Sequence, residues 1–366
     1  MPRSPHPPRR ATLASLAAEL KVSRTTISNA YNRPDQLSAD LRERIFDAAK
    51  RLGYPGPDPV ARSLRTRKAG AVGLMITEPL NYSFSDPAAL DFVAGLAESC
   101  EEAGQGLLLV AVGPNRTFEE GSNSVLSAGV DGFVVYSASD DDPYLPVLQQ
   151  RQLPVVVVDQ PKDVPGVSRI SIDDRGAMRE LAEYILELGH RDIGLLTMRL
   201  GRDWPHGDPR PALADPERVL SPHFHVQRER IQGVYDAMSA AGLDPASLTV
   251  VESYEHLPTS GGVAAEVALE ANPRITALMC TADVLALSAM DHLRSRGIYV
   301  PGHMTVTGFD GVPDALRRGL TTVKQPSMQK GRRAGQLLHN PPGSGLPVID
   351  VLPTEVVRGR TSGPPS

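Results

Sequence analysis

Apolar residues recur every three or four positions through the first fifty-odd residues, which is the period of an amphipathic helix. This pattern predicts three short helices, one from Leu13 to Leu20, one ending near Asn32, and one closed by Gly53. Thr12, Ser23 and Ser38 precede them and can act as N-caps. A three-residue turn separates the first two helices, so the pattern is that of a helix-turn-helix.

From residue 71 onward, short apolar runs alternate with helical patterns such as Arg175–Leu188 and Asp283–Arg296. Nearly continuous apolar runs are typical of parallel strands that are covered on both faces. The predicted strands are Val72–Ile76, Leu107–Val112, Gly132–Tyr136, Val155–Val158, Ile193–Thr197, Leu248–Val251, Ala277–Cys280 and Thr305–Gly308. Eight such strands predict a doubly wound α/β fold in two lobes, with a cleft at the strand ends.

The charge of the chain is divided unevenly between these two regions. The chain has 366 residues and a net charge of −5. Residues 1–68 hold 14 basic and 6 acidic residues, a net +8, so the remaining 24 basic and 37 acidic residues give −13. A basic head on an acidic body favours a polyanionic partner for the head alone. A solvated basic tail is the alternative reading of the charge.

The second predicted helix has the side chains that reading DNA requires. In a helix-turn-helix this helix lies in the major groove. Arg24 can donate twice to guanine, and Asn29 can pair with adenine. Thr25, Thr26 and Ser28 can bond phosphates or meet a thymine methyl group. A polar, solvated helix face is the alternative, but the three-helix pattern and the charge favour DNA.

After a proline-rich break, residues 59–68 predict a basic helix of about two turns, too short to be stable alone in water. It carries Arg62 and a single apolar residue, Leu64. We expect it to form on contact with a partner and DNA, with Leu64 as a wedge in the minor groove. An ordinary linker is the alternative.

The stretch ending at Leu64, "LAAELKVSRTTISNAYNRPDQLSADLRERIFDAAKRLGYPGPDPVARSL", resembles the DNA-binding head and hinge of the LacI/GalR family of bacterial regulators, the lactose- and purine-repressor type. "VDGFVVYS", "LGHRDIGLL", "RERIQGV", "TADVLALSAMDHLRSRGIYVP", "TVTGFDG" and "LTTVKQP" extend the resemblance through the body. It implies an all-α head, residues 1–56, a hinge, 57–70, and an effector-binding and dimerisation body, 71–366. The body would have two flavodoxin-like lobes of the periplasmic-binding-protein type, with an N-lobe of about 71–169 and 304–325 and a C-lobe of about 170–303 and 326–357.

The resemblance further implies a homodimeric repressor of sugar-utilisation genes that binds a palindromic operator and responds to a small effector, most often a sugar. The expected DNA-contacting residues are Thr12, Ser23, Arg24, Thr25, Thr26, Ser28, Asn29, Asn32, Arg62 and Leu64. By resemblance, Arg230, Asp283 and Asp310 would bind effector, although Asp283 could only cap a helix. Asp159 ends an apolar strand, and Tyr82 and Phe84 follow the first strand, where aromatic residues can stack on a ligand.

Other functions have weaker support in the sequence. The chain has no G-x-S-x-G, phosphate-loop or dinucleotide motif, so we expect no enzyme and no cofactor. A sugar-transport protein would fit the body, but the basic head and the absence of a signal peptide or membrane-spanning run argue for the cytoplasm. Two cysteines give neither a disulfide framework nor a metal site. The Pro-, Asp- and His-rich segment 199–225 is expected to cover part of the cleft mouth rather than to bind a metal.

Overall fold

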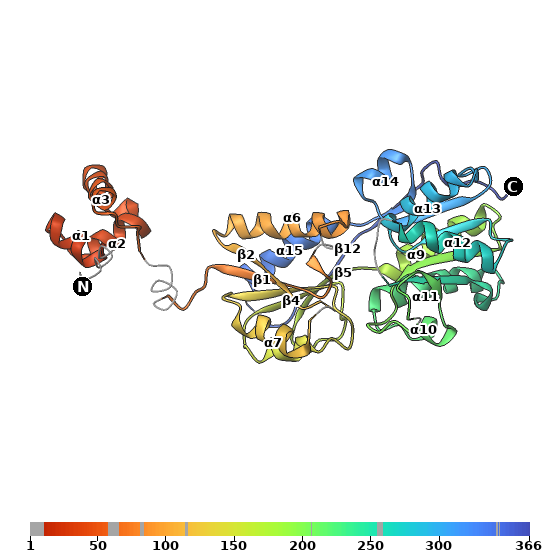
Figure 1. Cartoon of the computed structure of the whole chain (residues 1–366), viewed down its shortest axis with the longest axis horizontal. Coiled ribbons are helices and arrows are strands. Elements are labelled where there is room, and N and C mark those ends of the chain that lie inside the picture. Colours follow the sequence, from red (N-terminus) through yellow and green to blue (C-terminus); the bar gives the residue numbers. More distant parts are fainter. Residues whose placement is uncertain are drawn as a thin grey trace, which may run out of the picture. The chain divides into compact units, whose positions relative to one another are not determined.

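The computed structural model describes residues 11–57, 66–80, 84–113, 116–205, 207–254, 259–341, 343 and 345–366. It contains two compact units, a head, Met1–Ala69, and a body, Gly70–Ser366 (Figure 1). Most of the predicted hinge helix, including Arg62 and Leu64, lies outside the described residues, and so does Tyr82.

The head is the predicted bundle of three helices. They are α1 (Leu13–Leu20), α2 (Arg24–Asn32) and α3 (Ala39–Leu52), with a 3-10 turn at Pro34–Gln36. Thr12, Ser23 and Ser38 accept hydrogen bonds from backbone N–H groups of the first turns, which confirms all three N-caps. The head has its own core, to which all three helices contribute: Leu16, Ala17, Ile27, Ala30, Ile45, Ala48 and Ala49.

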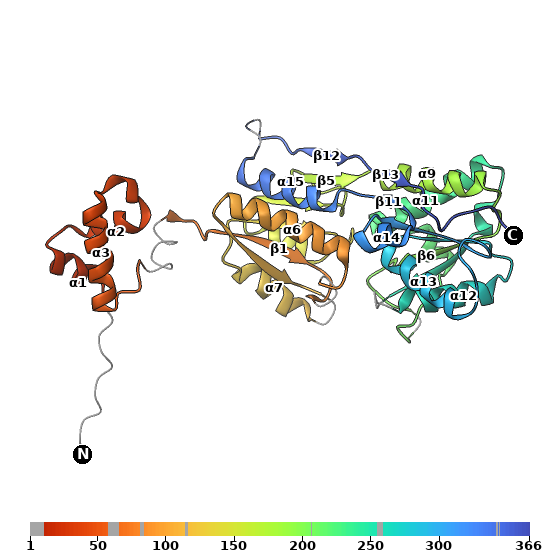
Figure 2. The same ribbon diagram turned by 90° about the horizontal axis from the view of Figure 1, so that it is seen from above.

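The first lobe of the body is a six-stranded parallel sheet in the order β12-β5-β4-β3-β1-β2. Its strands are β1 (Ala71–Ile76), β2 (Gly106–Ala111), β3 (Gly132–Tyr136), β4 (Val155–Val158), β5 (Ser168–Ile172) and β12 (Ile349–Leu352). Helices cover both faces (Figures 1 and 2). α6 (Pro87–Glu102) packs on α15 (Ser327–His339), and α7 (Phe118–Ser127) packs on α8 (Tyr144–Gln149).

The second lobe has a seven-stranded sheet in the order β13-β11-β10-β9-β6-β8-β7, in which only the two edge strands are antiparallel. Its strands are β6 (Ile193–Met198), β7 (Ala212–Leu213), β8 (Thr249–Ser253), β9 (Ala277–Cys280), β10 (Thr305–Asp310), β11 (Thr321–Lys324) and β13 (Glu355–Val357). Its helices are α9 (Asp174–Glu187), α10 (Pro216–Leu220), α11 (His225–Ala240), α12 (Ser260–Ala271), α13 (Asp283–Ser295) and α14 (Pro313–Arg318), with a 3-10 turn at Pro245–Ser247. α9 packs on α11, and α12 packs on α13. In the described part of the chain, no helix has the length and apolar character needed to cross a bilayer.

Both sheets contain the same parallel core. Without the additional edge strands, the orders β2-β1-β3-β4-β5 and β8-β6-β9-β10-β11 are each the flavodoxin-like 2-1-3-4-5 order. All eight predicted strands are present, and their bounds agree within two residues. Their apolar composition follows from burial on both faces. The predicted fold class is therefore confirmed.

The predicted division of residues between the lobes is wrong beyond residue 303. β10 pairs with β9 and β11 pairs with β10, so residues 304–325 belong to the second lobe. α15 packs on α6 and β12 pairs with β5, so residues 327–352 complete the first lobe. β5, Ser168–Ile172, also lies wholly in the first lobe. This division came from the family resemblance, and the residues themselves do not correct it, because an apolar run predicts a buried strand but not which of two similar sheets the strand joins.

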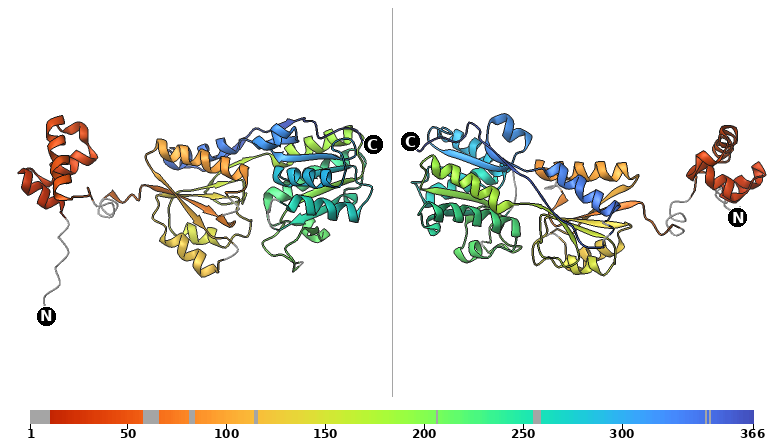
Figure 3. Two further views of the ribbon diagram at one scale, coloured as in Figure 1. Left: turned by 45° about the horizontal axis from the view of Figure 1, so that its top comes forward. Right: turned by 180° about the vertical axis from the view of Figure 1, so that it is seen from behind.

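The chain consequently crosses between the lobes three times. The crossings follow β5, separate β11 from α15, and separate β12 from β13 (Figures 2 and 3). Each lobe is thus assembled from segments that are distant in sequence. Three adjacent connections leave the lobes one common hinge, on the side where the strand ends face each other.

Candidate functional site

A polar cleft of about 120 Å³ lies between the lobes, lined by residues at the carboxyl ends of strands from both sheets. Three of these residues, Ser137, Asp159 and Asp310, have positive φ angles of 52°, 63° and 119°. Side chains other than glycine rarely adopt such angles, and where they persist they cluster at functional sites. Ligands of doubly wound sheets bind outside the carboxyl ends of the strands, so this cleft is the candidate site.

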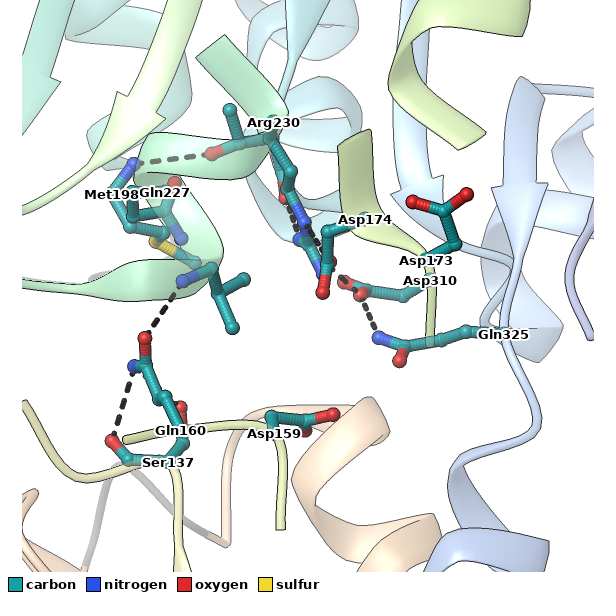
Figure 4. A network of polar contacts seen from close by, with 12 residues as sticks. Ser137, Asp159, Gln160, Asp173, Asp174, Met198, Gln227, Arg230, Asp310 and Gln325 are labelled. Atoms are coloured by element: carbon teal, nitrogen blue, oxygen red, sulfur yellow. Dashed lines mark hydrogen bonds and ion pairs between the residues drawn. The ribbon is translucent and has the colours of Figure 1, made fainter. Parts of the chain in front are cut away.

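Arg230, on α11, organises the wall that the second lobe contributes (Figure 4). Its Nε donates to Asp174 Oδ1 at 2.8 Å, and its Nη1 donates to the carbonyl oxygen of Thr281 at 2.5 Å. The guanidinium lies 3.6 Å from the centroid of the Phe309 ring. Asp310 Oδ1 is 4.0 Å from Nη1. The side chain is only 7% exposed, so it is held in one orientation toward the cleft.

A second group of buried polar side chains joins the two lobes through the hinge. Lys330 Nζ donates to both carboxylate oxygens of Asp159, at 2.8 and 2.7 Å, and to Gln325 Oε1 at 2.7 Å. Gln325 lies on the crossing between β11 and α15, and its Nε2 donates to Asp310 Oδ1 at 2.6 Å. The hydrogen bonds therefore run from the first lobe, through the crossing, to the second lobe.

Asp310 accepts from Gln325 and has a cationic atom of Arg230 only at 4.0 Å, so its carboxyl oxygens keep capacity for a further hydrogen bond. Burial raises the pKa of Asp310 well above its usual range; Arg230 opposes this rise, and the carboxylate of Asp283 adds to it. Burial also raises the pKa of Glu78, while the Arg199 guanidinium, which pairs with it across the lobes, lowers it. A ligand hydroxyl can donate to Asp310 without bringing another charge into the cleft.

The rest of the wall combines amide and apolar surfaces. Gln160 Oε1 accepts from the N–H of Val226 at 2.8 Å, and Gln227 Oε1 accepts from Thr197 Oγ1 at 2.9 Å. The apolar lining comes from both lobes: Ile76, Ala88, Ala89, Tyr136, Met198, Phe224, Val226 and Ala282. Paired donors and acceptors beside apolar surface are suited to a compact ligand that carries several hydroxyl groups.

Comparison with known proteins identifies the family. Residues 69–203 match the model described as periplasmic binding proteins and sugar binding domain of LacI family, and residues 182–362 match a periplasmic binding protein-like domain. The chain is 96% identical to a helix-turn-helix-type transcriptional regulator of Mycolicibacterium smegmatis over the full length of both. The chain belongs to the LacI family of transcriptional regulators. A further relative, a helix-turn-helix-type transcriptional regulator of Mycobacterium tuberculosis, is 75% identical and matches over 99% of this chain and 100% of its own length.

Solved LacI-family structures agree with this assignment. A LacI-family regulator from Corynebacterium glutamicum is 36% identical, with a TM-score of 0.74, covering 96% of this chain and 99% of that one. The complex of the regulator CelR with cellobiose is 27% identical, with a TM-score of 0.66, covering 96% of this chain and 100% of that one. These relatives are transcriptional regulators and not enzymes, in agreement with the prediction from the sequence.

The structure brings three of the six residues expected to bind effector together in the LacI-family cleft, namely Asp159, Arg230 and Asp310. Phe84 is 53% exposed and is not part of the lining. Asp283 is fully buried behind the cleft, where it accepts from Thr322 Oγ1 at 2.6 Å and from the N–H of Val312 at 2.8 Å. Asp283 therefore ties α13 to β11 and to the start of α14, so its expected place in the cleft is corrected.

The exposed side of α2 carries the residues expected to read DNA. Arg24 and Thr25 are exposed, and Asn29 Nδ2 donates to Gln36 Oε1 at 3.2 Å. The other expected contacts are engaged within the head. Thr12 and Ser23 serve as caps, Thr26 Oγ1 lies 2.8 Å from Ser23 Oγ, and Asn32 Nδ2 donates to the carbonyl oxygen and Oγ of Ser28.

Segment 199–225 lies at the cleft mouth, as expected, since Arg199 and Phe224 line the cleft. It is anchored by the antiparallel pairing of β7 with β8 and by Arg218, which donates to Glu252 at 2.8 Å. His223 pairs with Asp141 of the first lobe at 3.1 Å, and His206 lies outside the described residues. Among the described residues, no three His, Cys, Asp or Glu side chains are arranged to hold a metal ion.

The sequence analysis missed several lining residues. Glu78, Gln160, Arg199, Thr281 and Gln325 each follow the end of a strand by one or two positions. The rule that identified Asp159, applied to every predicted strand, would have found all of them except Gln325, because β11, Thr321–Lys324, was not among the predicted strands. Gln227 and Lys330 lie on helices, and no sequence signal marks them.

Proposed function

We propose that this chain is a ligand-responsive repressor that binds a palindromic operator as a homodimer in the cytoplasm. Residues 1–56 would be the DNA-binding head, 57–70 the hinge and 71–366 the effector-binding body. Membership of the LacI family supports regulation of transcription. The basic head supports DNA as its partner.

The effector is, by this proposal, a sugar or another polyhydroxylated small molecule. The observation that carries the proposal is the buried arrangement of Asp159, Arg230 and Asp310 in one cleft with apolar walls. A hydroxyl group can accept from Arg230 while it donates to Asp310, which a purely apolar or cationic ligand cannot do. The cellobiose bound by CelR, a relative of this chain, agrees with a sugar-like effector.

Effector binding would act by setting the angle between the lobes. The ligand touches side chains from both lobes beside the three crossings, so it favours the closed arrangement over the open one. Coupling free energies of this kind are typically about 1–3 kcal/mol. The hinge, with Arg62 and Leu64 as its DNA contacts, would carry that change to the heads.

On the operator, we propose that Arg24, Thr25 and Asn29 contact base edges. The capping and intrahelical bonds of Ser23, Thr26, Ser28 and Asn32 hold α2 in shape, and Thr12 caps α1. The hydroxyl groups among them can also meet phosphates. Each good bidentate contact to a base discriminates by about 1–3 kcal/mol.

A mobility-shift assay on the DNA upstream of the chain's own gene tests the function. We expect specific binding that weakens steeply as the salt concentration rises. Binding should also change when a sugar that acts as the effector is added. Arg24→Ala should relax base preference at one operator position by about 1–3 kcal/mol. No preference for any palindromic duplex over random DNA, with or without sugars, would refute the proposal.

A further inference from the structure

A second cavity, of about 500 Å³, opens beside the polar cleft, and we call it the outer chamber. It shares Arg199 and Phe224 with the cleft, so one ligand can occupy both spaces. Segment 199–225 forms one wall and the first lobe forms the other. Its remaining lining residues are Thr77, Val112, Gly113, Arg116, Ser139, Asp141, Asp142, Tyr144, Arg202, Asp203, His223 and Tyr254. Its volume is in the range of small-molecule sites.

The acidic side chains of the outer chamber already have partners. Asp141 Oδ2 lies 3.1 Å from His223 Nδ1, and Asp203 pairs with Arg218 at 3.1 Å. Asp142 is buried and accepts from the backbone N–H groups of Tyr144 and Leu145, at 2.9 and 3.1 Å. These carboxylates are therefore directed to groups of the protein rather than toward a ligand.

The basic side chains are less fully engaged. In the described part of the chain, neither Arg116 nor Arg202 has a carboxylate oxygen within 4 Å, and Arg116 donates only to Ser124 Oγ, at 2.9 Å. Arg116 comes from the first lobe and Arg202 from the second. Arg202 is near enough to Asp142 to oppose the rise that burial causes in the pKa of that carboxyl. Among the described residues, the chamber thus presents two guanidinium groups without a carboxylate oxygen within 4 Å, one on each side.

Two buried polar atoms of the chamber wall also lack partners. Ser139 is 2% exposed and its Oγ has no hydrogen bond within the described residues. Arg199 is 6% exposed, and its Nε–H is likewise unsatisfied although its Nη2 pairs with Glu78. An unpaired buried polar group is costly. The Nε–H of Arg199 can only donate, and the hydroxyl group of Ser139 can donate as well as accept, so an acceptor can satisfy both atoms.

We propose that the outer chamber binds a phosphate group of the effector, held between Arg116 and Arg202 and reached by the donors of Ser139 and Arg199. The ligand class is a phosphate monoester of a sugar or polyol, with its hydroxyl-bearing part in the polar cleft. The placement of the hydroxyl-bearing part in the polar cleft rests on the proposed function, whereas the phosphate site does not. Phosphate supplies acceptors only, and arginine forks match its oxygens. A phosphate that bridges the two arginines also draws the lobes together.

The chamber is tested first with inorganic phosphate and the full-length protein, by isothermal titration calorimetry. We expect saturable binding to the wild type and binding about tenfold weaker or worse in the Arg116→Gln/Arg202→Gln double variant. Both side chains are exposed, so the variant should keep its melting temperature. Arg210→Gln is the control, since this arginine lies in the same segment but pairs with Asp208 away from the chamber. Equal affinity in the wild type and the double variant, or no saturable binding to the wild type, overturns the proposal.

A second experiment separates this inference from the proposed function. Thermal shifts are compared for glucose, glucose 6-phosphate and gluconate, and for other hexoses with their phosphates, in the wild type and the double variant. The inference expects a larger shift from a phosphate ester than from its neutral parent, lost when both arginines are replaced. Equal shifts from ester and parent, with the parent altering operator binding, overturn the chamber and leave the repressor. Arginine-dependent phosphate binding by a protein that prefers no palindromic duplex over random DNA leaves the chamber and overturns the repressor.

Discussion

At the residue scale, Arg230 and Asp310 show how a charged site is kept inside the protein. Arg230 is paired with Asp174 and covered by Phe309, whereas Asp310 has its nearest cationic atom 4.0 Å away. Asp310 also keeps a φ of 119°. A buried carboxylate with an incomplete partner reduces stability, so its presence indicates a role other than holding the fold.

This imbalance predicts the effect of Asp310→Asn. The folded protein raises the pKa of Asp310, so it binds a proton more readily than the unfolded chain does, and stability falls as pH rises above the ordinary aspartate value. Because asparagine does not ionise, Asp310→Asn removes this loss of stability at higher pH. We expect the free energy of unfolding at pH 7 to be unchanged or raised, by up to about 2 kcal/mol, with the gain shrinking toward pH 4. Urea unfolding at several pH values measures this.

Asp310→Asn should also lose the change in operator binding that the effector causes. The exposed Asp163→Asn is the matched control, expected to change neither stability nor response. A large loss of stability in Asp310→Asn at pH 7 would show that the carboxylate supports the fold.

Individual site residues could be predicted only where a rule links sequence to position. Asp159 follows an apolar strand, and strand ends converge in this fold. The sequence could not exclude Asp283 as an effector-binding residue. An acidic residue at the start of a helix can cap the helix, make a structural hydrogen bond or bind a ligand, and the three cases look alike in the sequence. Lys330 was missed because its role depends on which lobe α15 joins.

At the scale of elements, the body is held together by helix pairs that meet at glycines. A Cβ on Gly95 of α6 would lie 1.9 Å from the carbonyl oxygen of Met328 on α15, and one on Gly331 would lie 2.0 Å from that of Phe92. Gly233 plays the same part between α11 and α9, and Gly261 between α12 and α13. The close approach lets each pair cover its sheet face without voids.

Replacing one of these glycines should therefore force two helices apart. We expect Gly331→Ala to lower the free energy of unfolding by about 1–3 kcal/mol, because the carbonyl of Phe92 cannot move without α6. Gly129→Ala is the control, since a Cβ there meets no atom within 4 Å, and it should leave stability unchanged or raise it by up to about 1 kcal/mol. Chemical denaturation of both variants makes the comparison, and equal stabilities would contradict it.

The elements themselves were largely predictable, and their pairing was not. Buried parallel strands are apolar throughout, so the eight runs were visible in the sequence. β5, β11 and β12 were missed because polar residues interrupt them, as in Ser168–Ile172. Which lobe a C-terminal segment joins depends on how many times the chain has already crossed between the lobes. The local pattern of apolar and polar residues contains no information about this number.

At the scale of the whole molecule, acids of the first lobe face bases of the second across the cleft mouth. Asp140 pairs with Arg228 at 2.9 Å, Asp141 with His223 at 3.1 Å, and Glu78 with Arg199. Asp140 with Arg228 and Glu78 with Arg199 place opposite charges on opposing rims. His223 adds a polar contact to Asp141, and a charge only when it is protonated, so all three pairs favour closure of the lobes. Partly exposed pairs are each worth about 0.2–1 kcal/mol, which is enough to shift an equilibrium between two conformations.

We expect Asp140→Asn/Asp141→Asn, which removes two of these pairs, to increase the ratio of open to closed protein by up to about thirtyfold. The radius of gyration from small-angle X-ray scattering should rise relative to the wild type without ligand. The control, Asp208→Asn/Asp163→Asn, makes the same change of charge within single lobes. Identical scattering from the two double variants would mean that the rim pairs do not hold the lobes.

A buried histidine adds a pH dependence to the stability of the body. His190 is buried, with Nδ1 2.8 Å from Thr276 Oγ1 and Nε2 2.8 Å from the carbonyl oxygen of Gly363. Burial lowers the pKa of His190 from its ordinary 6.5, so the unfolded chain binds the proton first. Stability is therefore complete above pH 6.5 and is lost as pH falls toward the lowered value.

His190→Gln should reduce the slope of the free energy of unfolding against pH, by up to about 1.4 kcal/mol per pH unit for one proton. Urea midpoints between pH 7.5 and 5 measure it. Burial also lowers the pKa of His225 and His339, so some slope remains. The exposed His303→Gln should leave the wild-type slope intact, and a His190→Gln slope equal to it would rule out this role for His190.

The three crossings also bear on how the protein is made. α15 and β12, Ser327–Leu352, are synthesised near the end, yet they complete the lobe that begins at Ala71. The core of the head needs nothing beyond its own helices. A chain still on the ribosome, or one cut short before residue 327, would carry a finished DNA-binding head beside an unfinished sensor. Premature termination in this gene should therefore yield fragments that do not respond to the effector.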